Sequence, residues 1–232
     1  MNQSPSRKRW WQFGLRTLLV CTVAFSLLFG FIAKERRRAA FIRYFQRSTG
    51  RTGLKQSPPW SFRRIAQKIL GDQIVGDLSM LDLEYAHIVD ADMEGAALCN
   101  EVQTLNLIDN HITDDGVRRI RFFRRLEKLY IGGSHAREIT DKGLLSLSRL
   151  RQLREFELRK TGVQGPGLAV LENMPNLESL SLWDSNVDNS GLPHLKKLRQ
   201  LKRLVVGRTM LTPDAIQELR DALPDCEVID DT

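Results

Sequence analysis

Apolar residues recur at regular intervals between residues 78 and 211. One template fits this stretch six times, with apolar residues at its first, fourth and sixth positions, then a small and mostly polar residue, another apolar residue and a short amphipathic segment. The copies start 24 residues apart, except that 27 residues separate the third start from the fourth. These starts are Leu78, Val102, Leu126, Leu153, Leu177 and Leu201. A period of this length predicts a stack of similar units that share one core.

Each copy of the template predicts a short strand followed by a helix. Alternation of apolar and polar residues places the fourth and sixth positions on the buried side of the strand. The fourth position is held by Leu81, Leu105, Leu129, Phe156, Leu180 and Leu204. Thr113 and Thr140 are expected to cap helix starts, with Asp114 and Asp141 at the positive end of the helix dipole. The pattern predicts an α/β solenoid over residues 78–232, a horseshoe with a parallel concave sheet and convex helices.

Both ends of the stack need a seal, because a terminal repeat has no neighbour to cover its core. We expect residues 57–77 to form an N-terminal capping helix, in which Phe62, Ile65 and Ile69 share one face. At the other end, residues 223–229 are expected to include a seventh strand. Asp230 and Asp231 follow this strand and should stop further stacking.

The first 56 residues have a different character. A predicted transmembrane helix at residues 15–33 lies between a basic tail, residues 1–14, and a basic juxtamembrane segment, residues 34–56. Its uncharged run, residues 17–33, spans roughly 26 Å as a helix, slightly less than the ~30 Å hydrocarbon core. A cleaved signal peptide stays an alternative, although Phe31 is large where a cleavage site needs a small residue. We expect a single-pass membrane protein, and the bases after the run favour cytoplasmic repeats.

Charge is divided unequally along the chain. The 232 residues contain 35 Lys and Arg and 28 Asp and Glu, and residues 1–70 hold 15 of the bases but only one acid, Glu35. Because the positive charge flanks the apolar run, we expect contact with membrane lipid through residues 15–33 and their basic flanks, and no nucleic-acid binding. The three cysteines, Cys21, Cys99 and Cys226, show no pairing pattern.

The repeats resemble ribonuclease-inhibitor-like leucine-rich repeats of the subtype with ITDxGL helix starts, which F-box-associated and many bacterial repeat proteins share. Residues 112–117 (ITDDGV) and 139–144 (ITDKGL) carry this likeness. The segments FGLRTLLV (13–20) and PPWSFRRIAQKILGD (58–72) are similar to those of membrane-anchored bacterial members. The resemblance implies protein binding on the concave face and offers no catalytic residues to transfer. No F-box is visible, and the first repeat lacks the ITDxG signature at residues 90–94.

Polar strand positions are expected to line the concave face. The predicted partner-binding residues are Lys128, Tyr130, Glu155, Glu157, Arg159, Trp183 and Arg203. Tyr130 and Trp183 are the expected anchors, since large aromatic side chains at exposed positions are typical of interfaces. The alternative is that Trp183 only covers neighbouring side chains. The third repeat contains three extra residues near residues 134–138, which predict a bulging loop that either binds a partner or is a tolerated insertion.

Three histidines, His87, His111 and His135, occupy the same template position in successive repeats. Strands stack ~4.8 Å apart, so His87 and His111 are weak candidates for metal ligands. The alternative, which we favour, is an ordinary exposed position with His135 displaced by the inserted loop. We therefore predict no bound metal.

Motifs typical of catalysis are missing from the sequence, which has no GxSxG elbow, no GxxxxGK[ST] loop and no HExxH pair. We expect no enzyme activity, no cofactor and no small-molecule substrate. The sequence favours a membrane-tethered, non-catalytic protein–protein interaction module with an unidentified protein partner. A structural envelope protein that acts by self-association stays an alternative, and a metal-binding or enzymatic site at the histidines is a weaker one.

Overall fold

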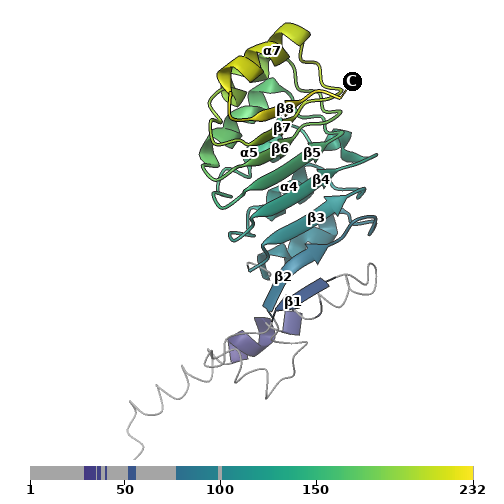
Figure 1. Cartoon of the computed structure of the whole chain (residues 1–232). Coiled ribbons are helices and arrows are strands. Elements are labelled where there is room, and N and C mark those ends of the chain that lie inside the picture. Colours follow the sequence, from purple (N-terminus) through teal and green to yellow (C-terminus); the bar gives the residue numbers. More distant parts are fainter. Residues whose placement is uncertain are drawn as a thin grey trace, which may run out of the picture.

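The computed structural model describes residues 29–34, 36–37, 40, 52–55, 77–98 and 101–231. Within these residues, the strands of one eight-stranded sheet lie side by side in chain order (Figure 1). β1 pairs antiparallel with β2, and each later pair is parallel. The strands are β1 (Thr52–Lys55), β2 (Asp77–Asp82), β3 (Thr104–Ile108), β4 (Lys128–Gly132), β5 (Glu155–Arg159), β6 (Ser179–Ser181), β7 (Arg203–Val205) and β8 (Glu227–Ile229).

The sheet register reproduces the template. Residues at the fourth template position stand opposite one another from β2 to β7, and none of these six side chains exposes more than 1% of its surface. They belong to a single hydrophobic core that runs through all the repeats. Full burial of a side chain such as leucine contributes roughly 1.5–3 kcal/mol, and a repeat of this kind cannot bury its apolar face without its neighbours. The predicted parallel stack is confirmed.

Short helices cover the other face of the sheet. Val117 and Ile120 in α4, and Leu144 in α5, point into the core as expected. The helices are shorter than the sequence suggested, and several are 3₁₀ helices, as in the glycine- and proline-containing segment η3. They are η1 (Asp90–Leu98), α4 (Asp114–Ile120), η2 (Ala136–Glu138), α5 (Asp141–Leu145), η3 (Gly165–Asn173), η4 (Asn189–Gly191), α6 (Leu192–Leu195) and α7 (Pro213–Ala222).

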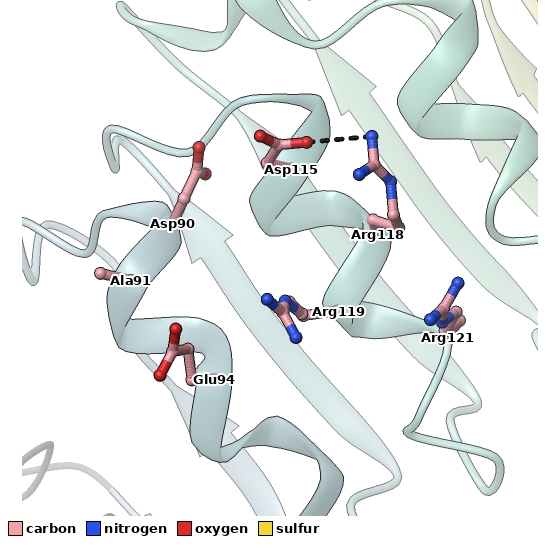
Figure 2. A pocket seen from close by; sticks show the side chains of 7 residues that line it. All are labelled: Asp90, Ala91, Glu94, Asp115, Arg118, Arg119 and Arg121. Atoms are coloured by element: carbon pink, nitrogen blue, oxygen red, sulfur yellow. Dashed lines mark ion pairs between the residues drawn. The ribbon is translucent and has the colours of Figure 1, made fainter.

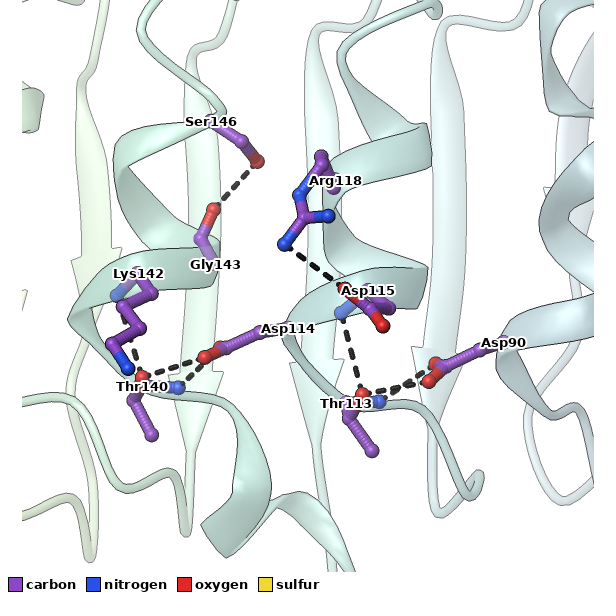
Figure 3. A network of polar contacts seen from close by, with 9 residues as sticks. All are labelled: Asp90, Thr113, Asp114, Asp115, Arg118, Thr140, Lys142, Gly143 and Ser146. Atoms are coloured by element: carbon purple, nitrogen blue, oxygen red, sulfur yellow. Dashed lines mark hydrogen bonds and ion pairs between the residues drawn. The ribbon is translucent and has the colours of Figure 1, made fainter.

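The ITD helix starts link each repeat to the next. Thr113 and Thr140 cap α4 and α5 as predicted, each accepting a backbone N–H at 3.3 Å. Asp114, at the first position of α4, does more than face the helix dipole. Its two carboxylate oxygens accept the N–H and the hydroxyl of Thr140 in the following repeat, both at 2.7 Å (Figure 3). Asp90 holds Thr113 in the same way at 2.9 and 2.6 Å, although the first repeat lacks the full signature.

Glycine in the ITDxG signature follows from this link. A Cβ on Gly143 would lie 2.5 Å from Oδ1 of Asp114, and one on Gly116 would lie 2.4 Å from Oδ1 of Asp90. Real Cβ atoms do not approach an oxygen so closely. The signature therefore needs a threonine that donates hydrogen bonds to the aspartate of the preceding repeat, and a glycine that leaves room for the same aspartate.

The two ends of the sheet differ. At the C-terminal end β8 pairs with β7, in agreement with the predicted seventh strand. At the other end β1, within the segment that we interpreted as a juxtamembrane linker, adds an antiparallel strand to the first repeat. The expected tail (1–14), residues 15–28 of the expected span and residues 57–76 of the expected cap lie outside the described residues. None of the helices in the described part of the chain has both the length and the apolar character needed to span a bilayer.

Candidate partner-binding face

The concave face gathers most of the predicted partner-binding residues. The register sets Lys128 against Glu155 and Tyr130 against Glu157 on β4 and β5. Trp183 lies two residues beyond the end of β6, close to Arg159. Arg203, the first residue of β7, is exposed and forms no salt bridge with the described residues, so it stands apart from the others.

Tyr130 and Lys128 both contact the same carboxylate. Lys128 Nζ lies 2.8 Å from Oε2 of Glu155, and the Tyr130 hydroxyl lies close enough to this carboxylate to interact with it. Burial, together with the neighbouring Glu155 carboxylate, raises the pKa of Tyr130 well above its usual range. The half-buried ring is therefore held in place by its own neighbours, which leaves it a rigid part of the face.

The middle of the concave face is acidic. Glu157 is half-buried, and this burial raises the pKa of its carboxyl although Arg159 beside it acts in the opposite direction. Arg159 Nη1 lies 3.2 Å from Oε1 of Glu157. Asp82 and Glu84 of the first repeat add further carboxylates, and Asn106 donates to both of them, at 3.1 and 3.4 Å.

Trp183 is surrounded by positive charge. Three cationic groups lie near the centroid of the Trp183 ring. The distances are 5.1 Å for Arg159, 5.7 Å for Lys160 and 5.1 Å for Arg208. We call Arg159, Lys160, Trp183 and Arg208 the tryptophan cluster. Cations at these distances are attracted to the face of an indole. Trp183 therefore does cover neighbouring side chains, and the cations that it holds are part of the same surface.

The inserted loop of the third repeat reaches this region. It contains η2, and Ala136 within it is buried. Arg137 extends to the fifth repeat, where its guanidinium lies 2.8 Å from Oδ1 of Asp184 and 2.6 Å from Oδ1 of Asn186. It also donates to the carbonyl of Thr161 in the fourth repeat at 3.3 Å. The extra residues thus fasten three repeats together beside Trp183.

Comparisons with known proteins agree with this architecture. Over 70 residues the chain is 44% identical to F-box/LRR-repeat protein 12 of Homo sapiens and 43% identical to that of Bos taurus. Each match covers 30% of this chain and only 20% of the relative. An internalin (inlF) from Listeria monocytogenes superposes with a TM-score of 0.54 at 19% identity, over 74% of this chain and 51% of that one. The chain is a leucine-rich-repeat solenoid.

No protein-family model matches the chain. An internalin C2 (inlC2) from Listeria monocytogenes gives a TM-score of 0.47 at 20% identity, over 68% of this chain and 70% of that one. The chain spans a fifth of the curated relatives and about half of the first internalin. The structural likeness at 19% identity is one of fold alone.

The three histidines of this leucine-rich-repeat solenoid form a column. The ring centroids of His87 and His111 are 6.1 Å apart, and those of His111 and His135 are 4.0 Å apart, with interplanar angles of 27° and 26°. The expectation that the inserted loop displaces His135 was wrong, because η2 begins only after this residue. Within the described residues no group of three or more His, Cys, Asp or Glu side chains is arranged to hold a metal ion.

A cleft on the helical side was not predicted. It encloses about 430 Å³ between η1 and α4 (Figure 2). Its only ion pair among the side chains drawn joins Arg118 to Asp115 at 2.9 Å. The lining residues are Asp90, Ala91, Glu94, Asp115, Arg118, Arg119 and Arg121. Six of these seven residues carry charge, with Asp90 and Glu94 on the η1 side and the three arginines on the α4 side. Charged side chains at an open cleft are typical of a solvated surface.

Sequence reasoning missed two parts of the candidate face. Lys160 and Arg208 were not predicted because both follow the strands, at positions where the backbone φ is positive, 54° and 57°. The signal was available in the template, since these residues occupy one position in the fourth and sixth repeats. The role of Arg137 could not be found in this way, because it depends on the path of a loop with no counterpart in the other repeats.

Proposed function

We propose that this chain is a non-catalytic protein-interaction module that holds a partner on its concave face. The observation that carries the proposal is the convergence of Tyr130, Glu157, Arg159 and Trp183 on one exposed side of a rigid sheet. Trp, Tyr and Arg are the residue types that dominate binding energy at protein interfaces. Repeat solenoids present such surfaces ready-formed, so little ordering is needed on binding.

Membrane tethering through residues 15–33 is part of the proposal. It is supported by the uncharged run and by the bases on both of its sides. An anchored scaffold of this kind concentrates its partner at a bilayer, and the larger number of bases after the run favours cytoplasmic repeats. A protease-accessibility assay on right-side-out and inverted vesicles tests the orientation, since cytoplasmic repeats are cleaved only in the inverted ones.

Site-specific photo-crosslinking in living cells tests the binding face. A benzoylphenylalanine in place of Ser181 on β6 faces the concave surface, and one in place of Arg149 is a control on an exposed position outside it. We expect a discrete protein adduct from the first position and none from the second. The same pattern of adducts from both positions would contradict the proposal, and an adduct with a second copy of this chain would instead support self-association.

A double variant completes the test. Tyr130→Ala with Trp183→Ala should keep the circular dichroism spectrum of the solenoid, because neither side chain belongs to the buried core. We expect it to reduce the yield of the Ser181 adduct at least fivefold, as removal of two interface anchors costs about 2 kcal/mol or more. An unchanged yield in a folded variant would exclude these two residues from the site.

A further inference from the structure

The tryptophan cluster carries more positive charge than the chain neutralises. Arg159, Lys160 and Arg208 all lie within 5.7 Å of the Trp183 ring centroid. Of the three, only Arg159 forms a salt bridge with the described residues, to the half-buried Glu157. An indole attracts cations through its quadrupole but cannot neutralise their charge.

The surroundings of the cluster leave this excess in place. Arg137 brings a fourth cation to the same edge, where its guanidinium forms a salt bridge of 2.8 Å with Asp184. Asp109 lies within electrostatic reach of Lys160, but it already accepts hydrogen bonds from the backbone and hydroxyl of Ser134. Lys160 and Arg208 are thus left without a salt bridge among the described residues, although carboxylates lie near them.

The cluster is also held in shape by the stack. The Lys160 N–H donates to the carbonyl of Trp183 at 2.9 Å, so the backbones of the fourth and fifth repeats are joined at the cluster itself. Lys160 and Arg208 occupy one template position two repeats apart, on either side of Asp184. In the first two repeats the same position holds Tyr85 and Asp109, so the cationic edge is confined to the C-terminal half.

We propose that the tryptophan cluster binds an acidic segment of the protein partner, with carboxylates of that segment between Lys160, Arg208 and Arg159. The inference rests on the proposed function and assigns the partner its chemistry. Guanidinium groups donate paired hydrogen bonds to a carboxylate, and the exposed part of the indole offers apolar contact to the flanking side chains. The acidic middle of the concave face, with Glu157, Glu84 and Asp82, repels further acids, so the segment must end at the cluster.

Peptide binding to the full chain in phosphatidylcholine nanodiscs tests the inference. The probe is a fluorescein-labelled peptide of six Glu-Gly units, and its neutral counterpart has six Gln-Gly units. Fluorescence anisotropy should show binding of the acidic peptide alone. We expect Lys160→Gln with Arg208→Gln to weaken it about tenfold, because two of the three cations that contact the carboxylates are lost.

A charge-matched control separates this site from general attraction. Arg149→Gln with Arg151→Gln removes the same charge from two exposed arginines that form no salt bridge with the described residues. We expect a change of less than twofold. Equal weakening by both double variants, or none by the first, would overturn the inference. Displacement of the peptide by inorganic phosphate at constant ionic strength, but not by acetate, would also overturn it, since the site would then prefer phosphate.

The photo-crosslinker at Ser181 distinguishes this inference from the proposed function. If the partner adduct forms equally well with Lys160→Gln and Arg208→Gln present, the concave face binds its partner without the cations and only the inference fails. Loss of the adduct in this variant, but not in the Arg149 and Arg151 control, supports both. Should the double variant not fold, the single change Arg208→Gln replaces it, because this side chain is exposed and its loss leaves the buried core intact.

Discussion

The link between Asp114 and Thr140 should contribute measurably to stability. Replacement of Asp114 by alanine removes both acceptors of the Thr140 N–H and hydroxyl, at 2.7 Å each. It leaves a partly buried N–H at the start of α5 without its partner. It also removes a negative charge from the first turn of α4.

These contributions set the expected magnitude. A hydrogen bond to a charged group contributes about 1.5–3 kcal/mol when buried, and both bonds here are only partly buried. The helix-dipole contribution is about 0.3–1 kcal/mol at an exposed site. We therefore expect Asp114→Ala to lower the free energy of unfolding by about 2–4 kcal/mol.

Asparagine provides a matched control, because the fifth repeat already uses it. Asn189 accepts the N–H of Thr212 at 3.0 Å and donates to its hydroxyl at 3.2 Å. Asp114→Asn can make the same two bonds, so a loss of only about 1 kcal/mol is expected. Urea unfolding of the full chain in a mild detergent, followed by circular dichroism, measures both variants.

A double-mutant cycle decides whether the link itself is responsible. Asp114→Ala and Thr140→Val, alone and combined, should show a coupling free energy of about 1 kcal/mol or more, since the residues are in direct contact. Additive losses would show that Asp114 acts on α4 alone. Equal losses for the alanine and asparagine variants would refute the hydrogen-bond explanation.

Three further changes test other parts of the structure. Gly143→Ala should destabilise the chain by about 1–3 kcal/mol in urea unfolding, because its Cβ would lie 2.5 Å from Oδ1 of Asp114. Arg137→Gln should cost at most about 1 kcal/mol, as its salt bridge to Asp184 is largely exposed, but limited proteolysis should cut the inserted loop faster. Glu157→Gln should stabilise the chain more at pH 7 than at pH 4. Because the pKa of Glu157 is raised in the folded state, the protonated carboxyl favours folding, and the wild-type chain loses this stability as the pH rises through the folded pKa. Glutamine stays neutral and keeps it.

Each of the three has an outcome that contradicts it. A neutral Gly143→Ala would mean that the neighbouring carboxylate moves aside without loss of its bonds. Unchanged cleavage of the Arg137→Gln loop would show that η2 is held by Ala136 alone. Equal effects of Glu157→Gln at both pH values would mean that burial does not disfavour the charged carboxylate.

The fold was predictable because equivalent apolar positions are buried in every repeat. Leu105 and Leu129, for example, must face the same interior if the units stack, and the structure sets them opposite each other. Strand β1 was not predictable, since residues 52–55 contain a glycine and a lysine in a stretch that reads as a linker. Its pairing depends on the open edge of β2, and no local pattern encodes such an edge.

The arrangement of the concave face was predictable only at positions that the repeat template covers. Tyr130 on β4 and Trp183, two residues past β6, follow from the alternation of the template, whereas the contacts of Arg137 join residues 47 to 49 positions apart. For the histidine column, the sequence pattern was right and our doubt about it was wrong. Equal template positions did bring His111 and His135 together, and doubt about the three extra residues was misplaced.

The inserted loop does not change the register of the strands on either side of it, since Lys128 still pairs with Glu155 and Gly132 with Arg159. The extra residues at this edge are thus accommodated without a change in the register of the sheet. Lineages that descend from such a solenoid can lengthen or shorten the rim while they inherit the interior unchanged. New specificity can arise there by small insertions, long before a new fold would be required.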